Sequence, residues 1–183
     1  YEITLEKMSK CNFDNVFVDT DSDEIKDYCM KHSIDIIDRL PELAKNTANG
    51  NDLLNYHASI IEADIYFQIF ITSPLLSIKT INTCIDVMKN KPEFDSVLTV
   101  EEIYSWFWFD NAPVNYDPKV LPRSQDARPI IKETTGLYGI RKSSLLRKKC
   151  RIGDSPYFYK SPLNETIDLD TEIDFENLSL IFE

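Results

Sequence analysis

The fold of this 183-residue chain is best indicated by the stretch Asp64-Ile65-Tyr66-Phe67-Gln68-Ile69-Phe70-Ile71. Its nearly continuous apolar character is typical of a strand that is buried on both faces of a parallel sheet. It runs into Thr72-Ser73-Pro74-Leu75, where a turn can place Pro74 at the first position of a helix. Apolar residues then recur at amphipathic-helix spacing from Ile78 to Met88. The sequence therefore predicts a strand, a turn and a helix in succession.

The same alternation extends in both directions along the chain. Further strands are expected at 16–20, 34–37 and 95–100, and further helices at 21–32 and 53–62. Alternating strands and helices predict right-handed βαβ units. The expected fold class is therefore α/β, with a doubly wound, mostly parallel sheet in a Rossmann-like three-layer arrangement. Ligands of such sheets bind beyond the carboxyl ends of the strands.

The pattern changes between residues 103 and 133. The aromatic run Tyr104-Ser105-Trp106-Phe107-Trp108-Phe109 leads into Asp110 and Asn111, which predicts a β-hairpin with its turn at these two residues. Such a concentration of aromatic side chains suits a core or a subunit interface. A platform on which bases stack is the other interpretation.

The composition argues against several classes of protein. A formal net charge of −11 argues against binding to a nucleic-acid backbone, because that affinity depends on Lys and Arg. No apolar run approaches the roughly 20 residues of a membrane span. His32 and His57 have no ligand partner at helical spacing and are expected to be surface or helix-face residues rather than ligands. The length predicts a single domain, residues 1–183. The lack of a C-x-x-C pair predicts reduced thiols in a cytoplasmic protein. The cysteines are Cys11, Cys29, Cys84 and Cys150.

Carboxylates alternate with apolar residues in Thr166-Ile167-Asp168-Leu169-Asp170-Thr171-Glu172-Ile173-Asp174-Phe175. If residues 166–170 are extended, Asp168 and Asp170 share one face of the chain. Such a pair suits a hard divalent cation such as Mg²⁺. The alternative is that Asp170 or Thr171 caps the last helix, whose first turn is acidic.

Short strings in order across nearly the whole chain resemble one known family. They are Val18-Asp19-Thr20-Asp21-Ser22-Asp23-Glu24-Ile25, Arg39 with Pro41-Glu42-Leu43-Ala44, Asn46-Thr47-Ala48, Thr72-Ser73-Pro74-Leu75, Arg123-Ser124-Gln125-Asp126, Glu133-Thr134-Thr135-Gly136, and Ile167-Asp168-Leu169-Asp170-Thr171-Glu172-Ile173-Asp174. In this order and spacing they are similar to the acylneuraminate cytidylyltransferases, enzymes that activate sialic acid and related sugars with CTP.

The resemblance implies a nucleotide-diphospho-sugar transferase-like fold and a homodimer, in which the hairpin of residues 103–133 dimerises and reaches toward the partner's site. It implies that Arg39, Thr47 and Ala48 bind the nucleotide, Ala48 through its backbone. Without the motif around it, Arg39 could be a solvated loop arginine.

The resemblance also implies a reaction and the residues that take part in it. Asp168 and Asp170 match catalytic carboxylates that carry Mg²⁺ beside the triphosphate, and Arg123 and Gln125 lie where the family contacts the acidic sugar. The implied reaction joins the anomeric hydroxyl of the sugar to the α-phosphorus of CTP and releases pyrophosphate. Phe70-Ile71 stands where the family often has a Gln-Pro pair that touches the sugar, so another anionic sugar is an open alternative.

Members of this family begin with a strand and a loop that cradles the triphosphate, and the sequence given starts after that point. We therefore expect these residues alone to be inefficient as an enzyme. The alternative function is a non-catalytic homologue that dimerises or senses a nucleotide.

Overall fold

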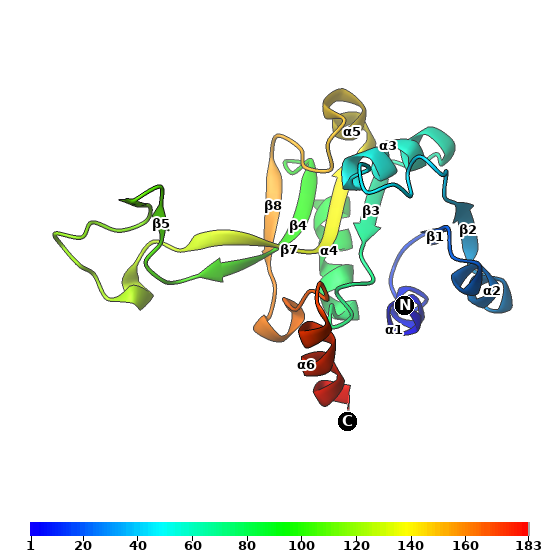
Figure 1. Ribbon diagram of the computed structural model, residues 1–183. Helices are drawn as coiled ribbons and strands as arrows, with labels where there is room; N and C mark the ends of the chain where they lie inside the picture. Colours follow the sequence, from blue (N-terminus) through cyan, green and yellow to red (C-terminus); the bar gives the residue numbers. More distant parts are fainter. Residues whose placement is uncertain (183) are drawn as a thin grey trace.

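The apolar stretch of residues 64–71 forms β3 (Ile65–Ile69) in a computed structural model that describes residues 1–182. β3 lies in a four-stranded sheet of order β3–β7–β4–β8 (Figure 1). The other strands are β7 (Ile130–Arg141), β4 (Ser96–Ile103) and β8 (Pro156–Lys160). β7 runs antiparallel to both β3 and β4, while β4 and β8 are parallel. Three of the four strands therefore share one direction, which confirms the mostly parallel sheet.

A second, separate strand pair lies beside β3 in Figure 1. It consists of β1 (Phe17–Thr20) and β2 (Asp35–Asp38), which are parallel and are joined by α2 (Asp23–Lys31). α1 (Glu2–Met8) precedes the pair, and within residues 1–182 neither β1 nor β2 pairs with the larger sheet. The α/β alternation was thus predicted correctly, but the strands form two sheets.

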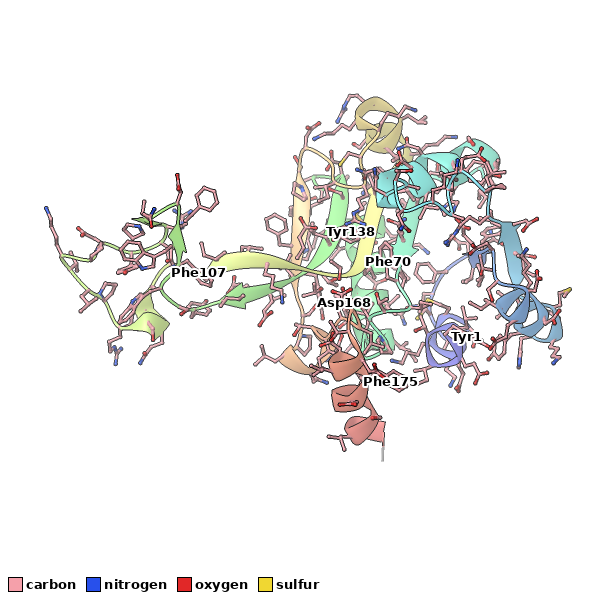
Figure 2. The ribbon with its side chains drawn as sticks, in the orientation of Figure 1. Tyr1, Phe70, Phe107, Tyr138, Asp168 and Phe175 are labelled. Atoms are coloured by element: carbon pink, nitrogen blue, oxygen red, sulfur yellow. The ribbon has the colours of Figure 1, made fainter. Side chains whose placement is uncertain are left out.

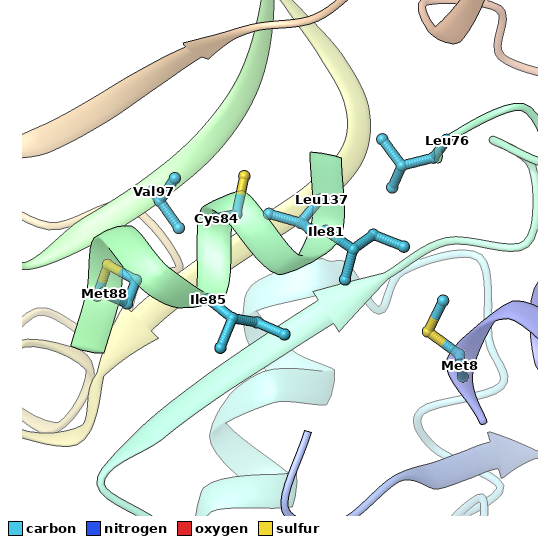
Figure 3. Packing of buried hydrophobic residues seen from close by; sticks show 8 residues of the cluster. All are labelled: Met8, Leu76, Ile81, Cys84, Ile85, Met88, Val97 and Leu137. Atoms are coloured by element: carbon cyan, nitrogen blue, oxygen red, sulfur yellow. The ribbon is translucent and has the colours of Figure 1, made fainter. Parts of the chain in front are cut away.

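One face of the larger sheet is covered by α4 (Ile78–Asn90). Its apolar residues recur at helical spacing, so they form one buried stripe that packs against Val97 of β4 and Leu137 of β7 (Figure 3). The odd-numbered residues of β3, Ile65, Phe67 and Ile69, pack against the same cluster. The helix contributes Ile81, Cys84, Ile85 and Met88.

The other face of the sheet is covered by α3 (Gly50–Ile60) and α5 (Lys142–Lys148). Leu54 of α3 packs against Tyr66, the even-numbered neighbour in β3 whose side chain points away from α4. Burial of each such apolar side chain contributes about 1.5–3 kcal/mol. These two clusters make the three layers that the alternation predicted.

Residues 104–129, which we call the projecting loop, connect β4 to β7 and extend away from the sheet (Figure 1). The loop contains the short strands β5 (Trp108–Phe109) and β6 (Ala112–Pro113), which pair antiparallel. Asp110 and Asn111 between them have φ of 47° and 62°. Positive φ at both central residues is typical of the tight turn that joins two strands, so the turn lies where the sequence predicts it.

Residues 166–170 form no regular strand. They follow a short 3-10 helix, Leu163–Glu165, and lead into α6 (Glu172–Phe182). The backbone N–H of Thr171 donates to Asp174 Oδ2 at 2.8 Å, and the N–H of Asp174 faces Thr171 Oγ1 at 3.3 Å. This reciprocal pair caps the helix, as the alternative interpretation of the stretch predicted.

The structure can be compared with what the sequence predicts for the cysteines and for membrane-spanning segments. All four cysteines are free, and Cys84 is fully buried, which raises the pKa of its thiol to about 12. Among residues 1–182, no helix has both the length and the apolar character that crossing a membrane requires.

Candidate functional site

A candidate site lies where β3 ends and where the chain returns after β8. The backbone N–H of Leu169 donates to the carbonyl of Thr72 at 2.8 Å, which fixes the acidic segment against the turn after β3. The buried carboxylate of Glu165 accepts a hydrogen bond from the N–H of Ser77 at 3.1 Å, at the start of α4. Asp168 is therefore held at the carboxyl end of β3 by backbone contacts (Figure 2).

A bulge in β7 forms the second wall of the site. The register between β4 and β7 shifts between Leu98 and Val100, so extra residues of β7 stand opposite Thr99. Thr99 Oγ1 accepts from the hydroxyl of Thr134 at 2.8 Å and from the N–H of Leu137 at 3.2 Å, which satisfies polar groups that the shift leaves without ladder partners.

Thr135 at the centre of this bulge has φ of 60°, a left-handed conformation that is strained for a β-branched residue. Its hydroxyl lies within hydrogen-bond distance of an oxygen of Asp168 and of the carbonyl of Thr134. The adjoining Gly136 is favoured by close approach, because a Cβ there would lie 3.1 Å from the Ser73 side chain. The strained bulge thus presents a hydroxyl to the acidic segment.

Asp168 is half-buried and only partly satisfied. One carboxylate oxygen contacts Thr135, whereas Oδ1 is buried and has no hydrogen-bond partner among the described residues. Ser73 Oγ nearby is buried and equally without a partner. Unsatisfied buried oxygens are costly, so two of them at one strand end indicate a place for a ligand.

Asp170 has a different environment, since its side chain is exposed and its backbone N–H points to Asp174 at 3.3 Å. Within residues 1–182, no group of three or more His, Cys, Asp or Glu side chains could hold a metal on protein ligands alone. Mg²⁺ commonly binds one or two carboxylates and fills its other positions with water and substrate phosphates. The Asp168 oxygen that lacks a hydrogen-bond partner suits such an ion. The described residues do not supply enough ligands to coordinate a metal on their own.

One arginine and two aromatic side chains that were not predicted from the sequence lie on the adjoining part of the sheet. The guanidinium of Arg151 lies over the ring of Tyr138, 3.6 Å from its centroid, and Phe70 packs beside Tyr138. The Tyr138 hydroxyl donates to Glu133 at 2.6 Å. Burial, followed by this hydrogen bond, raises the pKa of Tyr138 above its ordinary value.

The predicted nucleotide residue Arg39 is engaged within the protein, beside β1. Its Nε donates to Asp19 Oδ1 and its Nη2 donates to the Asp19 carbonyl, both at 2.8 Å. His57 lies on α3, as a helix-face residue should, and its Nε2 is 2.6 Å from the other oxygen of Asp19, a contact that its sequence spacing does not predict. Burial by itself raises the pKa of Asp19, but the bonds to His57 and Arg39 outweigh it and hold that pKa below its usual value.

Thr47 and Ala48 lie in the turn before α3, and Thr47 is exposed. The N–H of Ala48 donates to the carbonyl of Lys45 at 3.0 Å. Asn49 then caps α3 together with Asp52 in a reciprocal capping box. The turn is therefore well defined, but no hydrogen bond within residues 1–182 joins Thr47 or Ala48 to Asp168.

The predicted sugar residues Arg123 and Gln125 are exposed on the projecting loop. Arg123 Nε bonds Asp126 Oδ2 at 2.6 Å, three residues away. Within one chain, the structure therefore does not bring these residues together with Asp168, Arg39 or the 47–48 turn.

Comparisons with known proteins agree on one kind of protein. The family model described as cytidylyltransferase matches residues 1–150. N-acylneuraminate cytidylyltransferase A of Danio rerio is 24% identical over 172 residues, which are 89% of this chain and 40% of that protein. The N-acylneuraminate cytidylyltransferase of Streptococcus agalactiae is 24% identical over 169 residues, 88% of this chain and 41% of that protein. The chain thus spans about two fifths of the length of these relatives.

Solved structures show the same fold. A CMP:2-keto-3-deoxy-manno-octonic acid synthetase complexed with CTP superposes with a TM-score of 0.68 at 16% identity, covering 99% of this chain and 86% of that one. A 4-diphosphocytidyl-2C-methyl-D-erythritol synthase from Anaerococcus prevotii has a TM-score of 0.67 at 15% identity, covering 98% and 85%.

Proposed function

This chain belongs to the cytidylyltransferase family, and we propose that it serves the transfer of a cytidylyl group from CTP to an acidic sugar. The proposed sugar is sialic acid or a related nonulosonic acid, because relatives that match most of the chain are named N-acylneuraminate cytidylyltransferases. The products are a CMP-sugar and pyrophosphate.

The observation that carries the proposal is the buried Oδ1 of Asp168 at the carboxyl end of β3, which has no hydrogen-bond partner among residues 1–182. Sheets of this kind bind ligands at that end of their strands. The strained Thr135 contacts the same carboxylate, and strain of this kind is typical of ligand sites. The guanidinium of Arg151 adds positive charge on the same part of the sheet.

In the proposed reaction, the anomeric hydroxyl oxygen of the sugar forms a bond to the α-phosphorus of CTP. The bond from that phosphorus to the oxygen bridging to the β-phosphate breaks, pyrophosphate leaves with the electron pair, and the hydroxyl proton is released to water. Such a reaction needs mostly positioning and neutralisation of charge. A magnesium ion held by Asp168 and Asp170 would supply positive charge beside the α-phosphate.

The other proposed roles follow the location of each residue. Arg39 lies beside β1 and, with Thr47 and Ala48 of the turn before α3, is proposed to bind the cytidine nucleotide. Arg123 and Gln125 are proposed to contact the acidic sugar from the projecting loop of a partner chain in a homodimer. Their exposure on a loop that extends from the body supports this assignment.

Isothermal titration with CTP and Mg²⁺, using the longest form that the gene encodes, tests the function. We expect metal-dependent binding of CTP that Asp168→Asn weakens at least tenfold and that Asp170→Asn also weakens. Asp35→Asn, at an exposed carboxylate on β2, is the matched control and should bind CTP normally. ATP in place of CTP tests the choice of base.

Absence of any CTP binding by that longest form would overturn the assignment and leave the non-catalytic dimerising homologue as the better description. Equal CTP binding by Asp168→Asn and the unchanged protein would contradict the role given to this carboxylate.

A further inference from the structure

The chain after α5 is tied to α3 by two asparagine side chains. Asn51 Oδ1 accepts a hydrogen bond from the backbone N–H of Arg151 at 2.8 Å, and Asn55 Nδ2 donates to the carbonyl of Lys149 at 3.0 Å. The two asparagines are four residues apart on a helix, so they lie on the same face of α3. The backbone of Arg151 is therefore held in place by the protein itself.

The guanidinium of Arg151 is confined by the sheet and by the start of α3. Its Cζ lies over the ring of Tyr138, 3.6 Å from the centroid, and 5.7 Å from the ring centroid of Phe70. At the start of α3, a Cβ on Gly50 would lie only 2.6 Å from Arg151 Nη1, so glycine leaves room for the guanidinium there. These contacts limit the orientations that the guanidinium can adopt.

The N–H groups of this guanidinium have no acceptor in the part of the chain that the structure describes. The Arg151 side chain makes no hydrogen bond and no ion pair with any of residues 1–182. Arg39, Arg141 and Arg147 differ, since each donates to an oxygen of the protein. Arg151 is half-buried, and a partly buried charge without a partner is costly. An oxyanion of a ligand would supply the acceptors.

Arg151 and Asp168 both act on Tyr138. Burial raises the pKa of Tyr138 most, followed by its bond to Glu133, while the charge of Arg151 lowers this pKa and the charge of Asp168 raises it. Tyr138 also lies next to Asp168 in Figure 2. A Mg²⁺ ion on Asp168 would attract the phosphates of CTP. Arg151 is a separate positive charge on this part of the sheet, so it is available for a second anionic group.

We propose that Arg151 binds the carboxylate of the acidic sugar and makes the site selective for an acidic acceptor. This inference rests on the proposed function and names a further residue that determines its specificity. A guanidinium that stacks on a ring keeps its N–H groups in one plane, and two of them match the two oxygens of a carboxylate. The contact would come from the same chain as Asp168, whereas Arg123 and Gln125 would reach the sugar from the partner chain.

Steady-state kinetics with two sugars tests the proposal: N-acylneuraminate, and the analogue whose carboxylate is replaced by a carboxamide. Arg151→Met keeps an unbranched side chain against Tyr138 and removes the charge. For the acidic sugar we expect KM to rise by about tenfold or more, because the bonds that are lost join charged groups. For the carboxamide we expect KM to change by less than about threefold, and KM for CTP should stay within about twofold.

Two further variants are the matched controls. Arg151→Lys restores the charge but not the paired N–H groups, so part of the affinity for the acidic sugar should return. Arg147 is an exposed arginine of α5 that pairs with Asp154, so Arg147→Met should leave KM for both sugars unchanged. An equal rise of KM for both sugars in Arg151→Met, or a raised KM for CTP, would overturn the proposal.

NMR of the Arg151 side-chain Nε–H, identified by its loss in Arg151→Met, supplies a second measurement that needs no turnover. With CTP present and Mg²⁺ absent, N-acylneuraminate should shift this resonance in a saturable way, and pyrophosphate alone should not. No shift with N-acylneuraminate would overturn the proposal, and a shift with pyrophosphate only would assign Arg151 to a phosphate. If the sugar binds through Arg151 but no cytidylyl transfer occurs, the proposed function fails and this inference stands. If transfer occurs and does not depend on Arg151, this inference alone fails.

Discussion

Single carboxylates of this protein differ in how completely their oxygens are bonded. Asp95 accepts hydrogen bonds from the N–H groups of Asp154 and Ser155, at 2.8 and 3.0 Å, and from the Ser144 hydroxyl at 3.0 Å. Asp168 keeps a buried oxygen with no partner in the described chain. The first arrangement stabilises the junction of β4, α5 and β8, whereas the second leaves bonding capacity for a ligand.

Asp95→Asn should destabilise the fold by about 2 kcal/mol, because several donors lose a charged acceptor. Burial raises the pKa of Asp95, but its hydrogen bonds together lower it below the ordinary carboxyl value. The folded state therefore binds this proton less well than the unfolded chain. Its contribution to stability is complete above about pH 4 and is lost as the pH falls through the lower folded-state pKa. Urea unfolding from pH 7 to 3 should show a shallower loss for the variant, and parallel curves would contradict this account.

Asp168→Asn, unlike Asp95→Asn, should not destabilise the fold. Removing a half-buried charge whose Oδ1 has no partner should leave the free energy of unfolding unchanged or raise it by about 1 kcal/mol. The amide keeps an oxygen that can accept from Thr135. The same urea titration at pH 7 measures this, and a loss comparable to that of Asp95→Asn would show that the carboxylate is structural.

Among the elements, those with a strong local pattern were predicted best. The spacing of Ile81, Cys84, Ile85 and Met88 predicts α4, and the unbroken apolar run predicts β3. The Asp110–Asn111 turn could be predicted because few residues adopt positive φ readily. Each of these signals depends on neighbours within a few positions of the chain.

Features set by distant residues could not be predicted. The acidic segment at 166–170 alternates like a strand, but it pairs with none, and the N–H of Leu169 bonds the Thr72 carbonyl in the turn after β3 instead. The bulge at Thr135 depends on its register against β4, which a local pattern does not contain. Arg39 and His57 meet at Asp19 across 20 and 38 positions of sequence, and neither spacing matches a known motif.

The shape of the projecting loop depends strongly on one side chain. Asn115 Nδ2 donates to the carbonyls of Ser105 and Arg128 at 2.7 and 2.6 Å, and its Oδ1 accepts from the N–H of Phe107 at 2.9 Å. This one amide therefore joins both arms of the loop.

Asn115→Ala should open the loop locally, because three backbone groups lose their partner. We expect limited trypsin digestion within residues 104–129 to become at least tenfold faster, while the free energy of unfolding of the sheet changes by less than about 1 kcal/mol. Asn164→Ala, at an exposed asparagine outside the loop, is the control for a general effect of losing an asparagine. An unchanged digestion rate for Asn115→Ala would show that the loop is held by its aromatic contacts alone.

For the whole molecule, the proposed homodimer depends on apolar side chains of the projecting loop. Phe109 is 78% exposed, and Trp108 and Val120 of the same loop are also exposed. Grouped apolar exposure of this kind is typical of an interaction surface.

Phe109→Glu should therefore shift the protein toward monomer, with a dissociation constant raised at least tenfold in sedimentation equilibrium. Phe175→Glu, at an exposed phenylalanine of α6 away from the loop (Figure 2), is the matched control and should leave association unchanged. If both variants associate like the unchanged protein, the loop is not the dimer interface.

The division of the longer strands into two separate sheets also has a mechanical consequence. Hydrogen bonds from the α1–β2 part to the rest of the described chain involve side chains, such as Asn82 Oδ1 with the N–H of Asn12 at 2.8 Å and His57 with Asp19 at 2.6 Å. A chain pulled from its two ends would therefore extend in two steps. The first strand pair would detach at low force and the four-stranded sheet would resist to a higher one.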